Sequence, residues 1–304
     1  MSQFALVRKA VRQLLHLAGG PRRVAVAVSG GADSLALAAA VPPELERVGL
    51  IVDHHLQPGS SEIASQAAKQ LHGMDFDEVR VLSVSVGTSG GPEAAARKAR
   101  YRALREAAPD TLVLLGHTRD DQAETVLLGL GRGSGPRSIA GMRPLDPPWG
   151  RPLLTVPRTA TVAACAELGL TPWTDPHNAD PAFVRVRLRH EVLPLLEDVL
   201  QGGVASALAR TAAQLREDAE ALDLIAAKIP ISSELDVAAL AGEPPALRRR
   251  VLRRWLLAAG VLELTDAHLR SVDALIGEWR GQGGVWLPGG LEVSRVRGRL
   301  TVSG

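Results

Sequence analysis

The 304-residue sequence is poor in cysteine and lysine and has no long apolar run. Its one cysteine, Cys165, excludes an intramolecular disulfide and a cysteine-rich zinc cluster. This cysteine lies in an apolar helical stretch, which favours buried packing over reactivity. No apolar run reaches the ~20 residues of a membrane span, and the N-terminal segment spreads its basic residues rather than preceding an apolar core with them. We therefore expect a soluble, cytoplasmic protein with no membrane partner and no signal peptide.

Because lysine is scarce, arginine carries nearly all of the positive charge, with a net charge of +2 and a sequence pI of about 9.0. Each arginine cluster taken alone fits a solvated surface, whereas three clusters in the C-terminal part fit a nucleic-acid surface equally well. The third cluster alternates along an expected strand, which predicts that its arginines share one face. The clusters are Arg185, Arg187, Arg189 and His190; Arg248, Arg249, Arg250, Arg253 and Arg254; and Arg295, Arg297 and Arg299.

The chain is long enough for two domains, and 46% hydrophobic residues allow a sizeable core. Short apolar runs alternate with amphipathic segments from residue 24 to about 130, which predicts a doubly wound, mostly parallel α/β sheet. We expect a catalytic domain over 1–228, ending in a long helical region over 189–227, and a smaller, mostly helical domain over 229–304. The expected strands are 24–28, 48–52, 79–86 and 111–115; the expected helices are 35–40, 61–71, 92–107 and one after 119.

The segment Ser29-Gly30-Gly31-Ala32-Asp33-Ser34 joins an apolar strand directly to an apolar helix. Paired glycines let a backbone approach a ligand closely, and helix-start amides face an anion. The segment lacks the lysine of the other common phosphate loop and carries Asp33 instead, which repels phosphate unless a divalent cation lies between them. The residues therefore indicate a site for magnesium-complexed nucleotide, although a plain strand-to-helix connection fits the bare pattern equally well.

A second polar segment, residues 116–125, begins where the fourth expected strand becomes a helix. Asp120 and Glu124 are one turn apart and share a helix face, whereas Asp121 points elsewhere, toward the side of His117. Carboxylates at a helix start stabilise the dipole by about 0.3–1 kcal/mol, which does not explain the whole cluster. Asp33 and Asp121 together match the one or two carboxylates of a magnesium site.

Two further groups follow strands of the same expected sheet or lie beside them. Asp53 and His54 end the second strand, where a histidine either stacks on a base, donates to phosphate, or is simply exposed. Arg97 and Arg100 belong to a basic helical stripe over 94–102. Because ligands bind at the carboxyl ends of parallel strands, we expect these residues near the Ser29–Ser34 loop.

The Ser29–Ser34 segment resembles the SGGxDS loop of the N-type ATP pyrophosphatases, the PP-loop superfamily. Several other motifs, in order along the chain, resemble the tRNA(Ile)-lysidine synthase family, and residues 248–257 and 287–290 resemble its first C-terminal domain. The similarity spans nearly the whole chain, and we expect the second C-terminal domain of longer members to be absent. The motifs are residues 96–101, 116–125, 132–135, 151–154, 173–178 and 183–190.

The resemblance implies a ligase that uses ATP and magnesium to couple free L-lysine to the wobble cytidine of a CAU anticodon. In this family the base O2 attacks the α-phosphate, and the lysine amine then displaces AMP at C2. The amine, with a reference pKa of about 10.4, needs a nearby carboxylate to lose its proton, and Asp33 and Asp120 both remain candidates.

The resemblance further implies that Arg97, Arg100 and His117 hold ATP phosphates or the adenylated base. Glu124 is expected among the substrate contacts, and Arg185, Arg187 and Arg189 are expected on anticodon-loop phosphates of tRNA(Ile). His55, Gln57, Val186 and His177 depart from the family pattern, which bears on the contacts to base and lysine.

Two other functions use the same superfamily fold or the same tRNA partner. A PP-loop tRNA thiolase needs a reactive cysteine, which Cys165 does not resemble. A noncatalytic tRNA-binding protein would not require Asp33, Asp120 and Asp121. Homodimer formation is left open.

Overall fold

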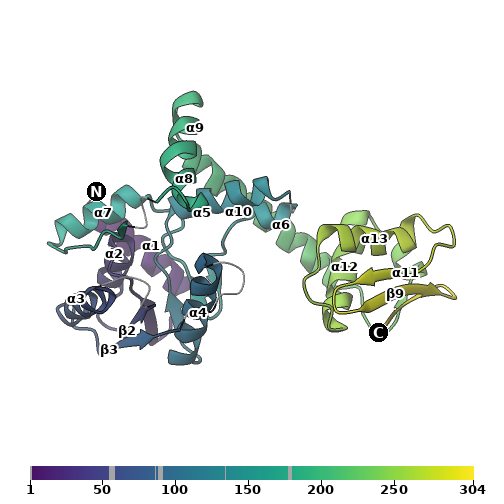
Figure 1. Cartoon of the computed structure of the whole chain (residues 1–304), viewed down its shortest axis with the longest axis horizontal. Coiled ribbons are helices and arrows are strands. Elements are labelled where there is room, and N and C mark those ends of the chain that lie inside the picture. The colour runs from purple at the N-terminus through teal and green to yellow at the C-terminus, as the bar shows by residue number, and fades with distance from the viewer. Residues whose placement is uncertain (1, 55–58, 86, 88–91, 134, 177–179) are drawn as a thin grey trace. The chain divides into compact units, whose positions relative to one another are not determined.

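The computed structural model describes residues 2–54, 59–85, 87, 92–133, 135–176 and 180–304 (Figure 1). The chain forms two compact units. The first contains residues 1–127 and 142–210, and the second contains residues 128–141 and 211–304.

The first unit is built on a six-stranded sheet in the order β3-β2-β1-β4-β6-β5. All neighbouring strands are parallel except β5 and β6, which confirms the predicted mostly parallel α/β fold. The expected strand over 79–86 is shorter than predicted, because β3 ends at Ser83. The strands are β1 (Arg23–Ala27), β2 (Glu46–Asp53), β3 (Glu78–Ser83), β4 (Leu112–Leu114), β5 (Leu145–Asp146) and β6 (Trp149–Gly150).

Alternation along β1 gives the sheet two buried faces. Val24 and Val26 pack into one apolar cluster, whereas Ala25 between them belongs to another. The first cluster also contains residues of α1 (Gln3–Leu17), α2 (Ala32–Ala40), α3 (Ser60–His72) and α7 (Arg158–Glu167). The second includes Leu104 of α4 (Pro92–Ala107). Helices therefore cover both faces of the sheet, as the alternating pattern predicts.

The strand order reverses at β1, which pairs with β2 on one side and β4 on the other. Such a switch point is where ligands bind in doubly wound sheets. The loop after β1 leads into α2, and the loop after β4 leads into α5 (Arg119–Gly131). Gly116 allows the loop after β4 to approach the first turn of α2, because a Cβ there would lie 3.1 Å from backbone atoms of Asp33 and Ser34.

Residues 189–227 are mostly helical, as predicted, but they do not form one helix. The structure instead has α8 (Val184–Arg187), a π-helical turn η2 (Leu188–Val192), α9 (Leu193–Val199) and α10 (Val204–Ala227). The break between α9 and α10 contains Gln201, Gly202 and Gly203, all with positive φ. Glycine adopts this conformation without steric cost, so the Gly202-Gly203 pair ends the helical run.

The second unit combines helices with a small antiparallel sheet in the order β7-β10-β9-β8. Its core gathers Trp255, Leu252 and Leu275 from the helices with Val293 and Leu300 from the sheet. The longer segment of the unit begins at Thr211, inside α10, because the end of that helix joins this core through Ala226. The predicted division into a catalytic domain that ends at residue 228 and a tRNA-binding domain that follows it stays a prediction. The elements are α6 (Pro136–Ile139), α11 (Ala238–Ala241), α12 (Pro245–Ala258), α13 (Asp266–Gly277), β7 (Leu235–Asp236), β8 (Val285–Leu287), β9 (Leu291–Val296) and β10 (Arg299–Ser303).

Most arginines of the second cluster make contacts inside this unit rather than forming a free surface. Arg248 Nε lies 2.7 Å from Asp273 Oδ1, and Arg250 Nε lies 3.0 Å from Asp223 Oδ1. Arg254 donates to the carbonyl of Ala226 at 2.7 Å. The cluster therefore ties α10, α12 and α13 together.

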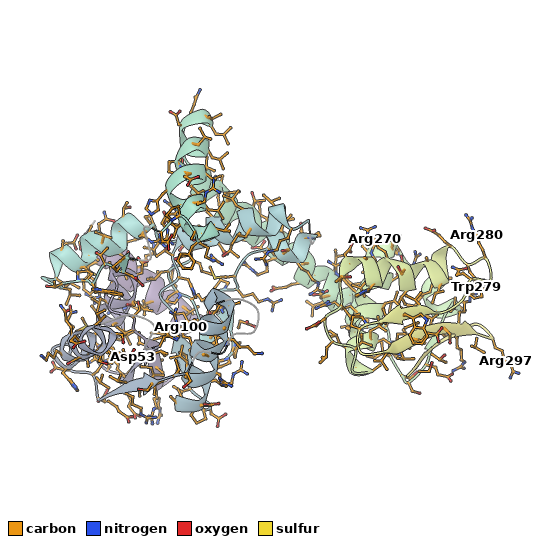
Figure 2. The ribbon with its side chains drawn as sticks, viewed as in Figure 1. Asp53, Arg100, Arg270, Trp279, Arg280 and Arg297 are labelled. Carbon is orange, nitrogen blue, oxygen red and sulfur yellow. The ribbon has the colours of Figure 1, made fainter. Side chains whose placement is uncertain are left out.

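The predicted single face for the third arginine cluster is wrong. Arg295 lies on β9 and donates to the Leu275 carbonyl at 2.8 Å, whereas Arg299 begins β10. Arg297 lies in the turn between them with a φ of 48°, and its side chain is exposed (Figure 2). A hairpin turn interrupts the alternation, so the three side chains do not share a strand.

No single helix in the described part of the chain is long and apolar enough to cross a membrane. One bent pair, Val184–Val199 with Val204–Ala227, meets that test on length and composition alone.

We predict that Gly129→Ala destabilises the protein by about 1–3 kcal/mol, because overpacking forces the backbone to shift. A Cβ at Gly129 would lie 2.4 Å from the backbone oxygen of Ser138. Gly131→Ala, in the same helix with nothing within 4 Å of its Cβ position, is the matched control and should change stability little. Urea unfolding measures both; equal midpoints would contradict the predicted close approach.

Candidate active site

The loop after β1 is shaped for an anion. Gly30 has a φ of +83°, and Gly31 precedes α2 without a side-chain cap. Ser34 Oγ donates to the Gly31 carbonyl at 2.9 Å and accepts from the Ser29 amide at 3.1 Å. The loop is thus held by its own serines, while the first turn of α2, beginning at Ala32, keeps free the amides that bind phosphate in such loops.

A distant segment fixes the same loop from outside. The Trp173 amide donates to the Gly30 carbonyl at 2.9 Å, and Trp173 Cβ lies 3.9 Å from the position of a Cβ at Gly30. The backbone of the Trp173 motif therefore holds the loop in place through a hydrogen bond.

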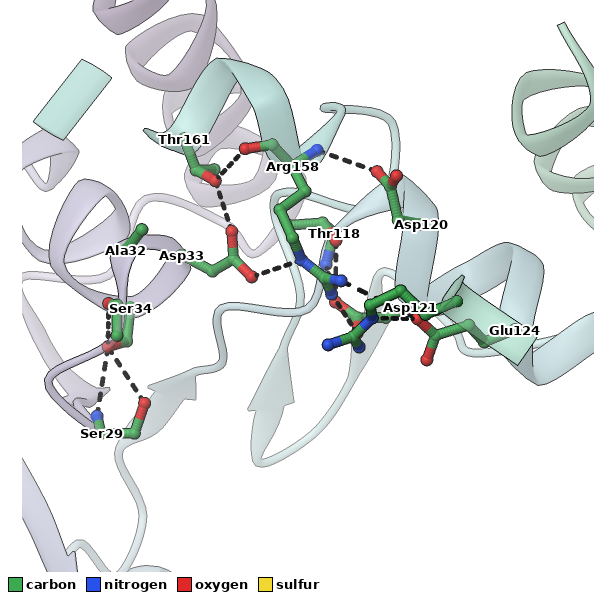
Figure 3. A network of polar contacts seen from close by, with 12 residues as sticks. Ser29, Ala32, Asp33, Ser34, Thr118, Asp120, Asp121, Glu124, Arg158 and Thr161 are labelled. Atoms are coloured by element: carbon green, nitrogen blue, oxygen red, sulfur yellow. Dashed lines mark hydrogen bonds and ion pairs between the residues drawn. The ribbon is translucent and has the colours of Figure 1, made fainter. Parts of the chain in front are cut away.

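Arg158, the first residue of α7, connects the loop after β1 with the start of α5 (Figure 3). Its Nε donates to Asp33 Oδ2 at 3.1 Å, and its Nη2 donates to Asp121 Oδ1 at 2.7 Å. Glu124 Oε1 lies 3.8 Å from Nη1 of the same guanidinium. One cation therefore faces three of the carboxylates singled out in the sequence.

The fourth carboxylate meets the backbone of the same residue. Asp120 Oδ2 accepts a 2.8 Å hydrogen bond from the Arg158 amide, which satisfies a free N–H at the start of α7. One turn further along α7, the Thr161 hydroxyl lies within hydrogen-bond distance of Asp33 Oδ1. Asp121 Oδ2 accepts from both the amide and the hydroxyl of Thr118, each at 2.8 Å. All four carboxylates are thereby held in fixed orientations.

Two of the three arginines predicted to bind tRNA phosphates instead lie against Glu124. Arg189 Nε donates to Glu124 Oε1 at 2.8 Å, and Arg185 Nη1 lies 3.6 Å from Oε2. These arginines are one turn apart, so they face the same way. Arg187 lies on another side, exposed and paired with Glu191 at 2.9 Å. The structure thus brings Arg185 and Arg189 to the site, but not Arg187.

Burial and the guanidinium give the carboxylates different pKa values. Burial raises the pKa of Asp33 above its usual value, although Arg158 and Thr161 oppose the shift. Burial acts the same way on Asp121, but Arg158 and the Thr118 hydrogen bonds outweigh it, so the pKa of Asp121 is lowered. Burial also raises the pKa of Glu124, whose side chain is fully buried. Unequal values in neighbouring carboxylates are typical of acid–base chemistry.

His117 follows β4 and is kept neutral. Burial lowers its pKa to about 4, and the nearby Arg151 adds to the effect against Asp121. Its Nδ1 is buried and makes no hydrogen bond with any described residue. A neutral imidazole with an unused ring nitrogen suits a hydrogen bond to a bound group.

The strand-end group Asp53-His54 meets α4. Arg100 Nε lies 3.4 Å from His54 Nε2, and Asp53 is buried beside Ser61. Figure 2 labels Asp53 and Arg100 in the first unit. Arg97 is exposed and stacks on the Tyr101 ring at 4.8 Å. The departures His55, Gln57 and His177 lie outside the described residues, whereas Val186 is buried in α8.

The predicted magnesium ligands fit a hard cation in part. Asp33 and Asp121 converge on one cation, the Arg158 guanidinium, and each is partly accessible, with side-chain exposures of 23% and 16%. No cluster of three or more His, Cys, Asp or Glu side chains among the described residues is arranged as a metal site. Two carboxylates suffice for Mg²⁺ when phosphate oxygens complete the coordination, so the donor set fits a nucleotide-bound ion.

Arg158 and Thr161 are the site residues that sequence reasoning missed. They lie 125 and 128 residues from Asp33 along the chain, and no spacing rule connects them. One local feature could have indicated Arg158. It follows Pro157, and proline often precedes or begins a helix, so Arg158 could have been predicted at a helix N-terminus.

Comparisons with known proteins identify the family of the chain. The PP-loop domain family matches residues 6–196, and the TilS substrate binding domain matches residues 235–301. The tRNA(Ile)-lysidine synthase of Rhodococcus erythropolis is 58% identical over 97% of this chain and 94% of its own length. That of Mycobacterium tuberculosis is 58% identical over 93% of this chain and 88% of its own length.

The chain belongs to the tRNA(Ile)-lysidine synthase family. Its function is therefore that of a tRNA-modifying ligase, and its PP-loop identifies it as a user of ATP. Among solved structures, a U34-tRNA thiolase from Methanococcus maripaludis has a TM-score of 0.59 at 18% identity, covering 71% of this chain and 79% of its own. That similarity concerns the fold alone.

Cys165 is buried and lacks the features of a reactive cysteine, as the sequence predicted. The side chain is 1% exposed, and Sγ lies 3.4 Å from the Ala32 carbonyl. Burial raises the pKa of the thiol to about 11. The thiolation alternative is not favoured.

We predict that Arg158→Met destabilises the protein by about 3 kcal/mol, because three carboxylates lose the cation that faces them. Arg187→Met removes an exposed arginine from an ion pair on one helix and should leave the unfolding free energy unchanged within error. Chemical denaturation at pH 7 compares the two variants. Equal stability of Arg158→Met and wild type would contradict the bridging role.

We predict that Cys165 resists alkylation in the folded protein, because a pKa of about 11 leaves roughly one thiolate in a thousand at pH 8. Iodoacetamide labelling followed by mass spectrometry should give one modified cysteine in denaturant and almost none in buffer. Rapid labelling of the native protein would contradict the burial of this thiol.

Proposed function

We propose that the site adenylates the wobble cytidine of the CAU anticodon of tRNA(Ile) and then couples it to L-lysine, releasing pyrophosphate and AMP. The observation that carries the proposal is the convergence of the PP-loop, Asp33 and Asp121 on one point at the strand-order reversal. Phosphate and carboxylate chemistry thus share one edge of the sheet. The tRNA substrate implies a cytoplasmic reaction.

In the first step, the cytidine O2 attacks the α-phosphate, and pyrophosphate leaves. The loop amides from Gly30 to Ser34 bind phosphate oxygens, and His117 donates or accepts one further hydrogen bond. A magnesium ion held by Asp33, Asp121 and phosphate oxygens would supply charge neutralisation for this transfer. Arg97, Arg100, Asp53 and His54 lie on the neighbouring elements, and we assign them to the nucleotide or the activated base.

In the second step, the lysine amine attacks C2 of the base, and AMP leaves. The amine must first lose a proton, and Asp33 is the better candidate of the two carboxylates considered. Burial raises the pKa of Asp33 in the protein without metal, so this carboxylate would accept a proton when no magnesium ion is bound to it, whereas Asp120 is engaged with the first turn of α7.

We assign Glu124 to a contact with the lysine substrate. The side chain is fully buried, and its Oε2 makes no hydrogen bond with any described residue. A buried carboxylate oxygen of this kind can accept from a substrate ammonium group. Arg185, Arg187 and Arg189 remain our candidates for anticodon-loop phosphates; for Arg185 and Arg189 this role requires sharing the guanidinium with Glu124.

We predict that the purified protein incorporates labelled lysine into a CAU-anticodon tRNA(Ile) transcript with one AMP released per lysine, given ATP and magnesium. Thin-layer analysis of AMP beside acid-precipitable lysine gives this ratio. ATP turnover without lysine transfer would refute the proposed second step.

We predict that Asp33→Asn lowers AMP release by at least about 100-fold, as expected for a group acting at the reacting phosphate. Asp110→Asn is the control, because Asp110 is exposed before β4, at the opposite edge of the sheet, in a left-handed conformation that asparagine tolerates. Full activity of Asp33→Asn would refute its assigned role.

A further inference from the structure

A row of cations lies along the exposed side of α1. Their spacing places them on one face of the helix, and each is exposed. We define this α1 stripe as Arg8, Lys9, Arg12 and His16.

The helix that carries the stripe is held rigidly. Val7, Val11 and Leu14, on the opposite side, are buried in the core that covers the sheet. At its start, Glu167 of α7 accepts from the amides of Gln3 at 2.9 Å and Phe4 at 3.2 Å. A preorganised surface loses little entropy when it binds a ligand.

The charge of the stripe is not balanced locally. α1 contains no acidic residue, and none of the four side chains forms an ion pair with any described residue. Arg8 contacts only a ring, lying 5.7 Å from the Phe4 centroid. A shallow hollow runs along this face, lined by Ala5, Arg8, Lys9, Arg12, Gln13 and His16.

Three arginines of the second cluster contrast with this surface. Arg248, Arg250 and Arg254, which the sequence suggested for nucleic acid, are engaged with carboxylates or carbonyl groups of their own unit. The α1 stripe, which the sequence did not single out as a binding surface, retains unengaged cations.

We propose that the α1 stripe binds backbone phosphates of the tRNA substrate. This inference rests on the proposed function, because it takes tRNA as the polyanion that the protein must hold. Phosphate contacts of this kind position a nucleic acid without reading its sequence. An anionic membrane is a poorer partner, since the apolar face of α1 is already buried and leaves nothing to insert.

The test is the salt dependence of tRNA affinity. The slope of log K against log salt concentration is negative, and the variant Arg8→Gln, Lys9→Gln, Arg12→Gln should reduce its magnitude by about 2–3, because each lost phosphate contact removes roughly 0.7–0.9. Filter binding from 50 to 300 mM KCl measures K for the full chain, and thermal unfolding checks that the variant is folded.

A matched control removes the same net charge from arginines that already have partners. Arg23, Arg80 and Arg270 pair with Glu46, Glu78 and Asp266, so replacing these three by Gln should leave the slope within about 0.5 of wild type.

Four outcomes would overturn the inference. An unchanged slope in the stripe variant, or an equal fall in both triple variants, refutes phosphate binding by the stripe while leaving the proposed function intact. Failure of the wild type to bind tRNA refutes both together. Binding of the wild type to phosphatidylserine vesicles that is lost in the stripe variant, with no change in tRNA slope, assigns the stripe to membranes instead.

Discussion

The organisation of the site depends on one guanidinium. Arg158 bridges Asp33 after β1 and Asp121 at the start of α5, and its backbone amide is bound by Asp120. Without this cation, the two carboxylates that contact the same guanidinium would repel each other. The same residue begins α7, so the ionic contact and the packing of that helix support each other. The interaction therefore sets both the shape and the charge of the site.

The sheet explains why this contact can form. The strand order reverses at β1, which brings the loops after β1 and β4 to one edge, and the missing side chain of Gly116 lets them approach closely. Packing on both faces then fixes the loops rigidly. Within this frame, burial raises the pKa of Asp33 while Arg158 and Thr118 lower that of Asp121. The two aspartates therefore differ in basicity, and Asp33 accepts a proton more readily than Asp121.

Arginine serves three separate purposes in this chain. In the second unit it ties helices together, as Arg248 does with Asp273, and in the first it either neutralises carboxylates or remains exposed along α1. The number of arginines in a sequence cluster does not tell these uses apart. An arginine that contacts a distant carboxylate and one that faces solvent have the same appearance in the sequence. The distinction depends on which side chains the fold brings opposite each guanidinium.

The sequence by itself determined the features that local chemistry encodes. Alternating valines predicted the strands, the Ser29–Ser34 segment predicted a phosphate loop, and the motifs identified the family, because each of these depends on residues that are neighbours in the chain. It did not reveal Arg158 or Thr161, the helix break at Gly202-Gly203, or the hairpin that separates Arg295 from Arg299. Tertiary structure decided the roles of Arg158 and Thr161, since their contacts with Asp33 join residues more than 100 positions apart. The helix break and the hairpin turn contain glycines with positive φ, a local signal that the periodicity of the surrounding residues masked.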